Sequence, residues 1–412
     1  MTIKARGTSA QQRVIWMATF APGVNGRRGL PYVLVGPPGG AKTSQLSQLA
    51  QTANLPFESV LGSLRSPVDF LGVPVPQRRQ LCAADQHLAP DGDEELLYMH
   101  YAPSGFALRA ALAKRAVVLF DEANTMPPSV QAAMLRVLFE GVVGELQLPP
   151  GVRFFLAMNA TEDAAGGWDI APPMANRMGW IDWSAPSVED WVTYMQGGAV
   201  IEPIDPTVEE KAVDAAWPKA FAQALGYVAG FLKRRGGELF HAVPKGSDKS
   251  KPWPSPRTWE FATRALAGSA VYGFGEDEEG LATAAFVGSG AYSEFKIWRR
   301  EADLPDPEKL LDKLETFEHK PARLDRTAAV LAACTAIVTA KGASAHKDHS
   351  DRVSNLWELM HGMGKDAVDV MSPSVVALNK ARLMMGTRDQ IAYKVMGDME
   401  PVLTAAGIAR LA

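Results

Sequence analysis

The chain has 412 residues, of which 47% are hydrophobic and 21% are charged, and its formal net charge is −4. This composition excludes an intrinsically disordered chain, and the length predicts two or three domains. The small negative charge gives no overall attraction to nucleic acid or to anionic membranes, although a local basic surface leaves nucleic-acid binding open. Cys82 and Cys334 lack metal-ligand spacing and are interpreted as buried thiols. No export signal or membrane span is predicted, so we expect a cytoplasmic protein.

The first chain segments predict a strand that leads into a phosphate-binding turn. A helix is expected at residues 10–20 and a loop at 22–28. The apolar run 31–35 then leads directly into the glycine-rich residues 36–43, and a helical stretch follows at 44–52. The order is therefore strand, glycine loop and helix.

The next hundred residues alternate between strand and helix patterns. The run Val117–Phe120 lies in a continuously apolar stretch, as expected for a strand buried on both faces of a parallel sheet. Further elements are expected as strands at 58–61, 116–120 and 152–158, helices at 105–114 and 127–140, and hairpin insertions near 66–102 and 142–151. This alternation predicts a doubly wound α/β domain with a mainly parallel sheet.

From Ser187 onward the pattern is mostly helical. Ser187 with Asp190 and Thr207 with Glu210 resemble capping boxes, and Ser255 before a proline predicts a helix that begins at residue 256. The predicted organisation is an N-terminal helix and loop (1–28), an α/β nucleotide-binding core (29–186), a helical lid (187–304) and a helical C-terminal region (305–412).

The glycine loop carries the first chemical signature. Its sequence GPPGGAKT is close to G-x-x-x-x-G-K-[ST], with Ala41 where the last glycine usually stands. Backbone N–H groups can turn inward around phosphates where no Cβ intervenes, and the following helix adds its positive end. Lys42 is predicted to reach the β- and γ-phosphates of ATP and Thr43 to bind Mg²⁺. The predicted nucleotide-binding residues of this segment are Gly36, Pro37, Pro38, Gly39, Gly40, Ala41, Lys42, Thr43 and Ser44.

Two strand ends supply the second signature. The strand VVLF ends in Asp121 and Glu122, which are predicted to orient Mg²⁺ and to polarise the attacking water, respectively. A pair of acids that merely caps a strand is common, but the upstream glycine loop favours catalysis. Asn159 ends the next apolar run and is predicted to contact the γ-phosphate or the water, since both strands end where ligands bind.

Two arginines are candidates for contacts with ATP. Arg177 follows a short helical segment and could act as an arginine finger toward the ATP of a neighbouring subunit. Arg257 lies at the second position of its predicted helix and could reach the γ-phosphate from the second domain. A surface ion pair is an equally good interpretation of either residue from chemistry alone.

Taken in order, these motifs resemble the MoxR-like family of AAA+ ATPases over roughly residues 36–265. The resemblance includes GPPGGAKT as Walker A, SPVDFLG at 66–72 and LFDEANTMPPSVQAAMLRVLFEGVV around Walker B. It implies Asn159 as sensor 1, Arg177 as arginine finger and Arg257 as sensor 2. It also implies a ring, usually a hexamer, with ATP at its interfaces and chaperone-like action on partner proteins, often ones with von Willebrand A-type domains. The two hairpin insertions would then face the pore.

Three functions remain open at this stage. The first is an ATP-hydrolysing remodeller of a protein partner. The second is a nucleic-acid-dependent motor of the same superfamily, against which the charge balance argues mildly. The third is a nucleotide-dependent assembly module with little turnover, against which the intact Glu122 argues.

Overall fold

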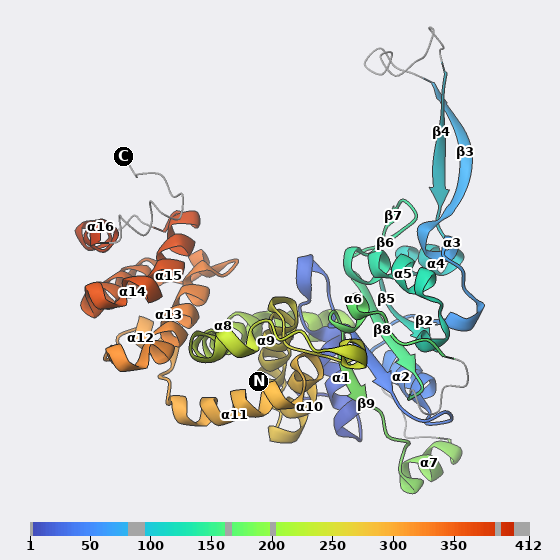
Figure 1. The fold of residues 1–412 in the computed structure, drawn as a ribbon, viewed down its shortest axis with the longest axis horizontal. Helices are drawn as coiled ribbons and strands as arrows, with labels where there is room; N and C mark the ends of the chain where they lie inside the picture. Colours follow the sequence, from blue (N-terminus) through green and yellow to red (C-terminus); the bar gives the residue numbers. More distant parts are fainter. Residues whose placement is uncertain (1–2, 81–94, 161–166, 198–202, 384–388, 399–412) are drawn as a thin grey trace. The chain divides into compact units, whose positions relative to one another are not determined.

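The computed structural model describes residues 3–80, 95–160, 167–197, 203–383 and 389–398 (Figure 1). The chain forms two compact units. The first, called the sheet unit, comprises Arg6–Glu209 and Lys245–Pro252. The second, called the helical unit, comprises Met1–Ala5, Glu210–Pro244 and Trp253–Ala412. The sheet unit contains the glycine loop and both acidic strand ends.

A five-stranded sheet organises the sheet unit, and every pair of neighbouring strands in it is parallel. The α/β class with a parallel sheet is therefore confirmed. The order across the sheet is β2 (Phe57–Leu61), β5 (Arg115–Asp121), β8 (Gly151–Met158), β1 (Tyr32–Val35) and β9 (Gly179–Asp182). Strand β8 thus separates the strand of the glycine loop from the strand of the two acids.

Helices cover both faces of the sheet, which explains the continuously apolar strands. Alternate residues of β5 and β8 pack with α4 (Gly105–Ala113) and α5 (Pro128–Glu140), and the intervening residues are also buried. On the second face, the buried Arg153 of β8 donates from Nε to the carbonyl of Thr19 at 3.1 Å. Its guanidinium lies 5.9 Å from the ring of Phe20, so α1 (Ala10–Phe20) covers that face.

Antiparallel strands occupy the two segments for which hairpin insertions are expected. Strands β3 (Val73–Gln80) and β4 (Glu95–Ala102) form a ribbon that extends away from the five-stranded sheet (Figure 1). Strands β6 (Val142–Val143) and β7 (Leu146–Gln147) form a short hairpin. Its turn contacts the base of the ribbon, where the N–H of Glu145 donates to the carbonyl of Tyr101 at 3.3 Å. Cys82 lies outside the described residues.

The remaining elements are helices. Within the sheet unit these include α2 (Lys42–Thr52), α3 (Val68–Leu71), α6 (Pro172–Ala175) and α7 (Val188–Met195). Helix α8 (Pro206–Leu239) continues from the sheet unit into the helical unit. The helical unit also contains α9 (Pro256–Tyr272), α10 (Glu276–Val287), α11 (Ser289–Ala302), α12 (Pro307–Leu311), α13 (Leu324–Thr339), α14 (His349–Met363), α15 (Val368–Lys380) and α16 (Asp389–Asp398).

Helix starts follow the predicted caps with one exception. The Ser187 hydroxyl accepts from the N–H of Asp190 at 3.0 Å, and Ser255 forms a capping box at the start of α9. The expectation for Thr207 is wrong, because α8 already begins at Pro206. The carboxylate of Asp205 accepts from the N–H of Thr207 at 2.8 Å. Asp205 and the proline that follows it therefore set the start of the helix.

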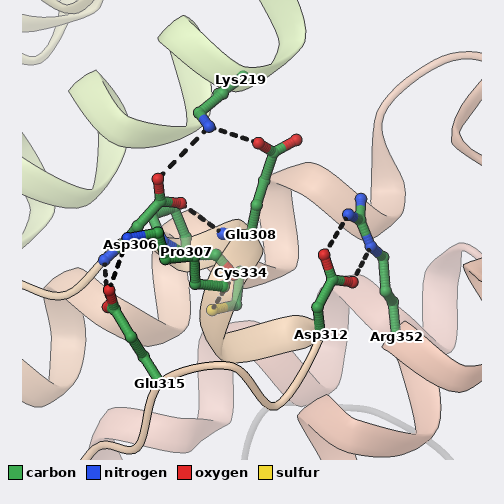
Figure 2. A network of polar contacts seen from close by, with 9 residues as sticks. Lys219, Asp306, Pro307, Glu308, Asp312, Glu315, Cys334 and Arg352 are labelled. Atoms are coloured by element: carbon green, nitrogen blue, oxygen red, sulfur yellow. Dashed lines mark hydrogen bonds and ion pairs between the residues drawn. The ribbon is translucent and has the colours of Figure 1, made fainter.

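A polar network joins α8, α12 and α14 in the helical unit (Figure 2). Lys219 of α8 pairs with Glu308 at 2.5 Å and with Asp306 at 3.4 Å. Arg352 of α14 forms a bidentate ion pair with Asp312, in which Nε and Nη2 donate to the two carboxylate oxygens at 2.7 and 2.9 Å. The hydrogen bond from Arg352 holds the pKa of Asp312 below its ordinary value. These ion pairs hold α8, α12 and α14 together around the segment that follows α11.

Cys334 is a buried free thiol on α13, as predicted, and burial raises its pKa to about 12. Its sulfur donates to the carbonyl of Pro307 at 3.8 Å. None of the helices in the described part of the chain combines the length and the apolarity that a membrane crossing requires.

Candidate active site

The loop between β1 and α2 has a backbone shape that few side chains allow. Gly36 approaches the carbonyl of Trp183 so closely that a Cβ would lie 2.3 Å from that oxygen. Gly39 has a φ of 75°. Ala41 also adopts the left-handed conformation, with φ 58° and ψ 23°, directly before Lys42 begins α2. The alanine thus keeps the backbone conformation that glycine normally provides at this position of the motif.

The Lys42 ammonium lies across the mouth of this loop. The residue is buried, and Nζ donates to the carbonyls of Gly36 and Pro37, each at 2.9 Å. It also donates to Oδ1 of Asn159 at 3.2 Å. The loop and the end of β8 are therefore joined through one cation, which is the group expected to hold phosphate oxygens.

Thr43 and Asp121 meet directly. The Thr43 hydroxyl donates to Oδ2 of Asp121 at 2.5 Å, although the two residues are separated by 78 positions in the sequence. Oδ1 of Asp121 accepts from the N–H of Glu122 at 2.9 Å. Glu122 has a left-handed backbone, with φ 55° and ψ 45°. One carboxylate oxygen is thus turned to the threonine, while the next residue starts a sharp turn beyond the strand.

Strand order explains why these side chains meet. Parallel strands β5, β8 and β1 are neighbours, so their carboxyl ends lie side by side at one edge of the sheet. Asp121, Asn159 and Gly36 stand at those three ends. Ligands of open α/β sheets bind at this edge. The predicted residues of the phosphate loop, the acid pair and sensor 1 therefore come together.

Asn124, for which the sequence predicted no role, joins two parts of this site. It is buried and its amide Nδ2 donates to the carbonyl of Asn159 at 3.1 Å. Its own carbonyl accepts from the N–H of Trp168 at 2.6 Å. The signal in the sequence was a short polar residue two positions after Glu122, where α5 has not yet begun.

Gln131 was also missed, and it attaches the segment before α6 to α5. Its side chain is fully buried, and Nε2 donates to the carbonyls of Met126 at 3.0 Å and Asp169 at 3.3 Å. Oε1 accepts from the N–H of Ala171 at 2.8 Å. An amide within the apolar face of α5 was the available signal, because buried polar groups need partners.

The two arginines have different surroundings. Arg177 follows α6, donates from Nη1 to the carbonyl of Pro173 at 2.7 Å, and lies 5.2 Å from the ring of Phe139 on α5. Helix α5 therefore carries Gln131 and also contacts Arg177 through Phe139. Arg257 is exposed in the first turn of α9, in the helical unit.

A cavity of about 690 Å³ adjoins the glycine loop within the sheet unit. Gly39 and Ala41 line it on one side, while Trp16, Trp191 and Tyr194 contribute aromatic surface from α1 and α7. Trp191 and Tyr194 remain 54% and 61% exposed, so their rings are available to a ligand. No sequence pattern predicts this cavity, because its lining comes from three separate helices, α1, α2 and α7.

Comparison with known proteins adds little to the geometry. No family model matches the chain, and no curated protein matches it. Among solved structures it is similar to a protein from Cytophaga hutchinsonii named as a putative ATPase, with 16% identity and a TM-score of 0.43. That similarity covers 70% of this chain and 86% of the other.

Proposed function

We propose that this chain binds Mg-ATP at the carboxyl edge of its parallel sheet and hydrolyses it. One observation carries the proposal, namely that Lys42, Thr43 and Asp121 converge with Asn159 at three neighbouring strand ends. A cation, a hydroxyl and a carboxylate in that arrangement are the groups that a triphosphate and its metal require. Glu122, next to Asp121, is the candidate for polarising the attacking water.

The residues present fit magnesium and a nucleotide. Magnesium is typically held by one or two protein oxygen ligands together with phosphates and waters, and Thr43 and Asp121 supply two such oxygens within 2.5 Å of each other. When bound, the metal neutralises phosphate charge. The cavity beside Gly39 and Ala41 suits the nucleoside, because the exposed rings of Trp191 and Tyr194 can pack on a planar base.

In its finer form the proposal is a MoxR-like AAA+ ATPase that acts as a ring, usually a hexamer, on a protein partner. The motif order supports this assignment, and so does the position of Arg177, which α5 and Phe139 hold in place. Arg177 would act on the ATP of a neighbouring subunit and Arg257 would serve as sensor 2. Partners with von Willebrand A-type domains are the class that the resemblance suggests.

The test is the Glu122→Gln variant of the full chain. It removes the carboxylate but retains the loop, so we expect ATP affinity within a few-fold of the wild type and a turnover lower by about a hundredfold or more. Glu140→Gln is a matched control, because this exposed glutamate at the end of α5 pairs only with Arg136 among the described contacts. Equal turnover of wild type and Glu122→Gln would refute the assignment. Parallel titrations with ATP and GTP identify the base.

A further inference from the structure

The β3–β4 ribbon has two outer edges, and they differ in their ability to accept another strand. In the antiparallel register, Tyr101 lies opposite Pro74 and Met99 lies opposite Pro76. No residue of either strand is buried. A free edge offers backbone N–H and C=O groups to another extended chain. Whether each edge can do so depends on which residues point their backbone groups outward.

Contacts of Tyr101 show which residues of β4 point outward. Its carbonyl accepts from the N–H of Glu145 at 3.3 Å, and its N–H donates to Oε1 of Glu145 at 3.4 Å. Both groups therefore face away from β3. Because the backbone alternates with a period of two residues, Met99 and Leu97 also point their N–H and C=O groups away from β3.

The same register shows that the outer edge of β3 lacks two donors near its start. Residues directly opposite each other in an antiparallel pair share the same orientation, so positions 74 and 76 also face outward. Both are prolines and have no N–H to donate. On β4, in contrast, the outward backbone groups of Leu97 and Met99 have no hydrogen-bond partner within the described residues. At positions 97 and 99 the outer edge of β4 therefore keeps its N–H donors, whereas the outer edge of β3 lacks them at positions 74 and 76.

Side chains beside the open edge indicate the chemistry of the occupant. Leu97 and Met99 are 66% and 48% exposed, and Tyr101, 42% exposed, shares their face of the ribbon. An added strand would place alternate side chains next to Leu97 and Met99. The occupant therefore has apolar residues at every second position. Glu145 already occupies the edge at Tyr101, so an added strand would extend that pairing along β4.

We propose that the outer edge of β4, at Leu97 and Met99, binds an extended apolar segment of a partner protein as an additional strand. A second copy of β4 suits this edge less well. Symmetric antiparallel pairing about the same two residues would bring the second copy's Glu95 against Tyr101, where Glu145 is bound. A short flexible segment can end before that point. The inference rests on the proposed function only in taking a protein as the partner, because binding at this edge requires no turnover.

Fluorescence anisotropy of the full chain tests the proposal. The probe is a fluorescein-labelled decapeptide of alternating valine and threonine with a glutamate at each end. Met99→Pro removes one outward N–H from β4 but no ladder bond to β3, and we expect binding weaker by about tenfold or more. Arg78→Pro places the same substitution on the outer edge of β3, opposite Leu97, and should bind like Arg78→Ala. Equal affinity of Met99→Pro and wild type would overturn the proposal.

Two methylated probes make the test independent of protein folding. N-methylation at the valines blocks one set of alternating N–H groups, and N-methylation at the threonines blocks the other. Strand addition requires that one of these peptides loses binding to the wild-type chain while the other retains it. Equal binding of both, or self-association of the chain through β4 without peptide binding, would contradict the proposed occupant. ATP turnover, measured separately, should be unchanged in Met99→Pro; a chain that binds peptide but lacks turnover would refute only the ATPase assignment.

Discussion

Replacement of Gly230 by alanine should destabilise the helical unit, although alanine favours helices. Gly230 lies in α8 where that helix closely approaches α13. A Cβ at this position would lie 2.7 Å from the carbonyl oxygen of Asp325, 2.8 Å from Cβ of Ala329 and 2.8 Å from the ring of Trp298. Real Cβ contacts are not this short, and one of the atoms is backbone. The helices must therefore separate or shift to accommodate the methyl group.

The size of the effect follows from two opposing terms. Overpacking costs about 1–3 kcal/mol, while the gain in helix propensity from glycine to alanine is up to about 1 kcal/mol. Gly237 provides a matched control in the same helix, since a Cβ there meets no atom within 4 Å. Gly237→Ala keeps the propensity gain without the clash. The difference between the two variants therefore isolates the packing term of about 1–3 kcal/mol.

Hydrogen exchange read by mass spectrometry, together with thermal unfolding, resolves this difference within the helical unit. We expect faster exchange in α8 and α13 of the Gly230→Ala variant and a midpoint about 2–4 °C lower for each kcal/mol. Gly237→Ala should exchange like the wild type or more slowly. A Gly230→Ala variant as stable as Gly237→Ala would show that α8 and α13 do not approach this closely.

Three further predictions concern the site and the ion pairs. Asn124→Ala should lower kcat by about tenfold with little change in ATP affinity, because it removes a buried hydrogen bond that positions β8; steady-state kinetics would show this. Asp312→Asn should weaken the loss of unfolding free energy at acid pH, measured by urea unfolding at several pH values. The lowered pKa of the Asp312 carboxyl adds stability that is present above the pKa of the unfolded chain and is lost as pH falls through the pKa of the folded chain. Arg177→Ala should lose about a thousandfold in turnover and regain part of it when mixed with Lys42→Ala subunits.

The sequence predicted the site most successfully where one local pattern carried both structure and chemistry. An apolar run, a glycine turn and a helix need only short-range information, and the structure has that order, although the helix expected at 44–52 begins two residues earlier at Lys42. The apolar run before Asp121 indicated a strand buried on both faces. Parallel pairing then places the ends of such strands at one edge without further detail. Thr43 and Asp121 could therefore be associated before their contact was known.

What the sequence could not predict depends on contacts between distant segments. Gln131 looks like an ordinary polar residue of a helix until its partners at positions 169 and 171 are known. The cavity beside the loop needs α1, α2 and α7 together. Thr207 illustrates a local failure, because the helix begins one residue earlier at Pro206 and the carboxylate of Asp205 binds its first turn. The outward direction of the Leu97 backbone groups could likewise be assigned only from the register with β3.

Two residues with left-handed backbones flank the proposed phosphate site, and neither belongs to a type that favours this conformation. Ala41 has φ 58° and Glu122 has φ 55°, whereas Asn25 and Asn54 of the same unit are of a type that tolerates it. Such a conformation costs roughly 1–2 kcal/mol per residue, so the surrounding structure must impose it.

At Ala41 the close approach of Gly36 to Trp183 and the bonds of Lys42 fix the loop from both sides. At Glu122 the carboxylate of Asp121 and the hydroxyl of Thr125 bind the turn. Contacts within the chain therefore impose both conformations, and these conformations shape the loop and the acid turn of the proposed ATP site.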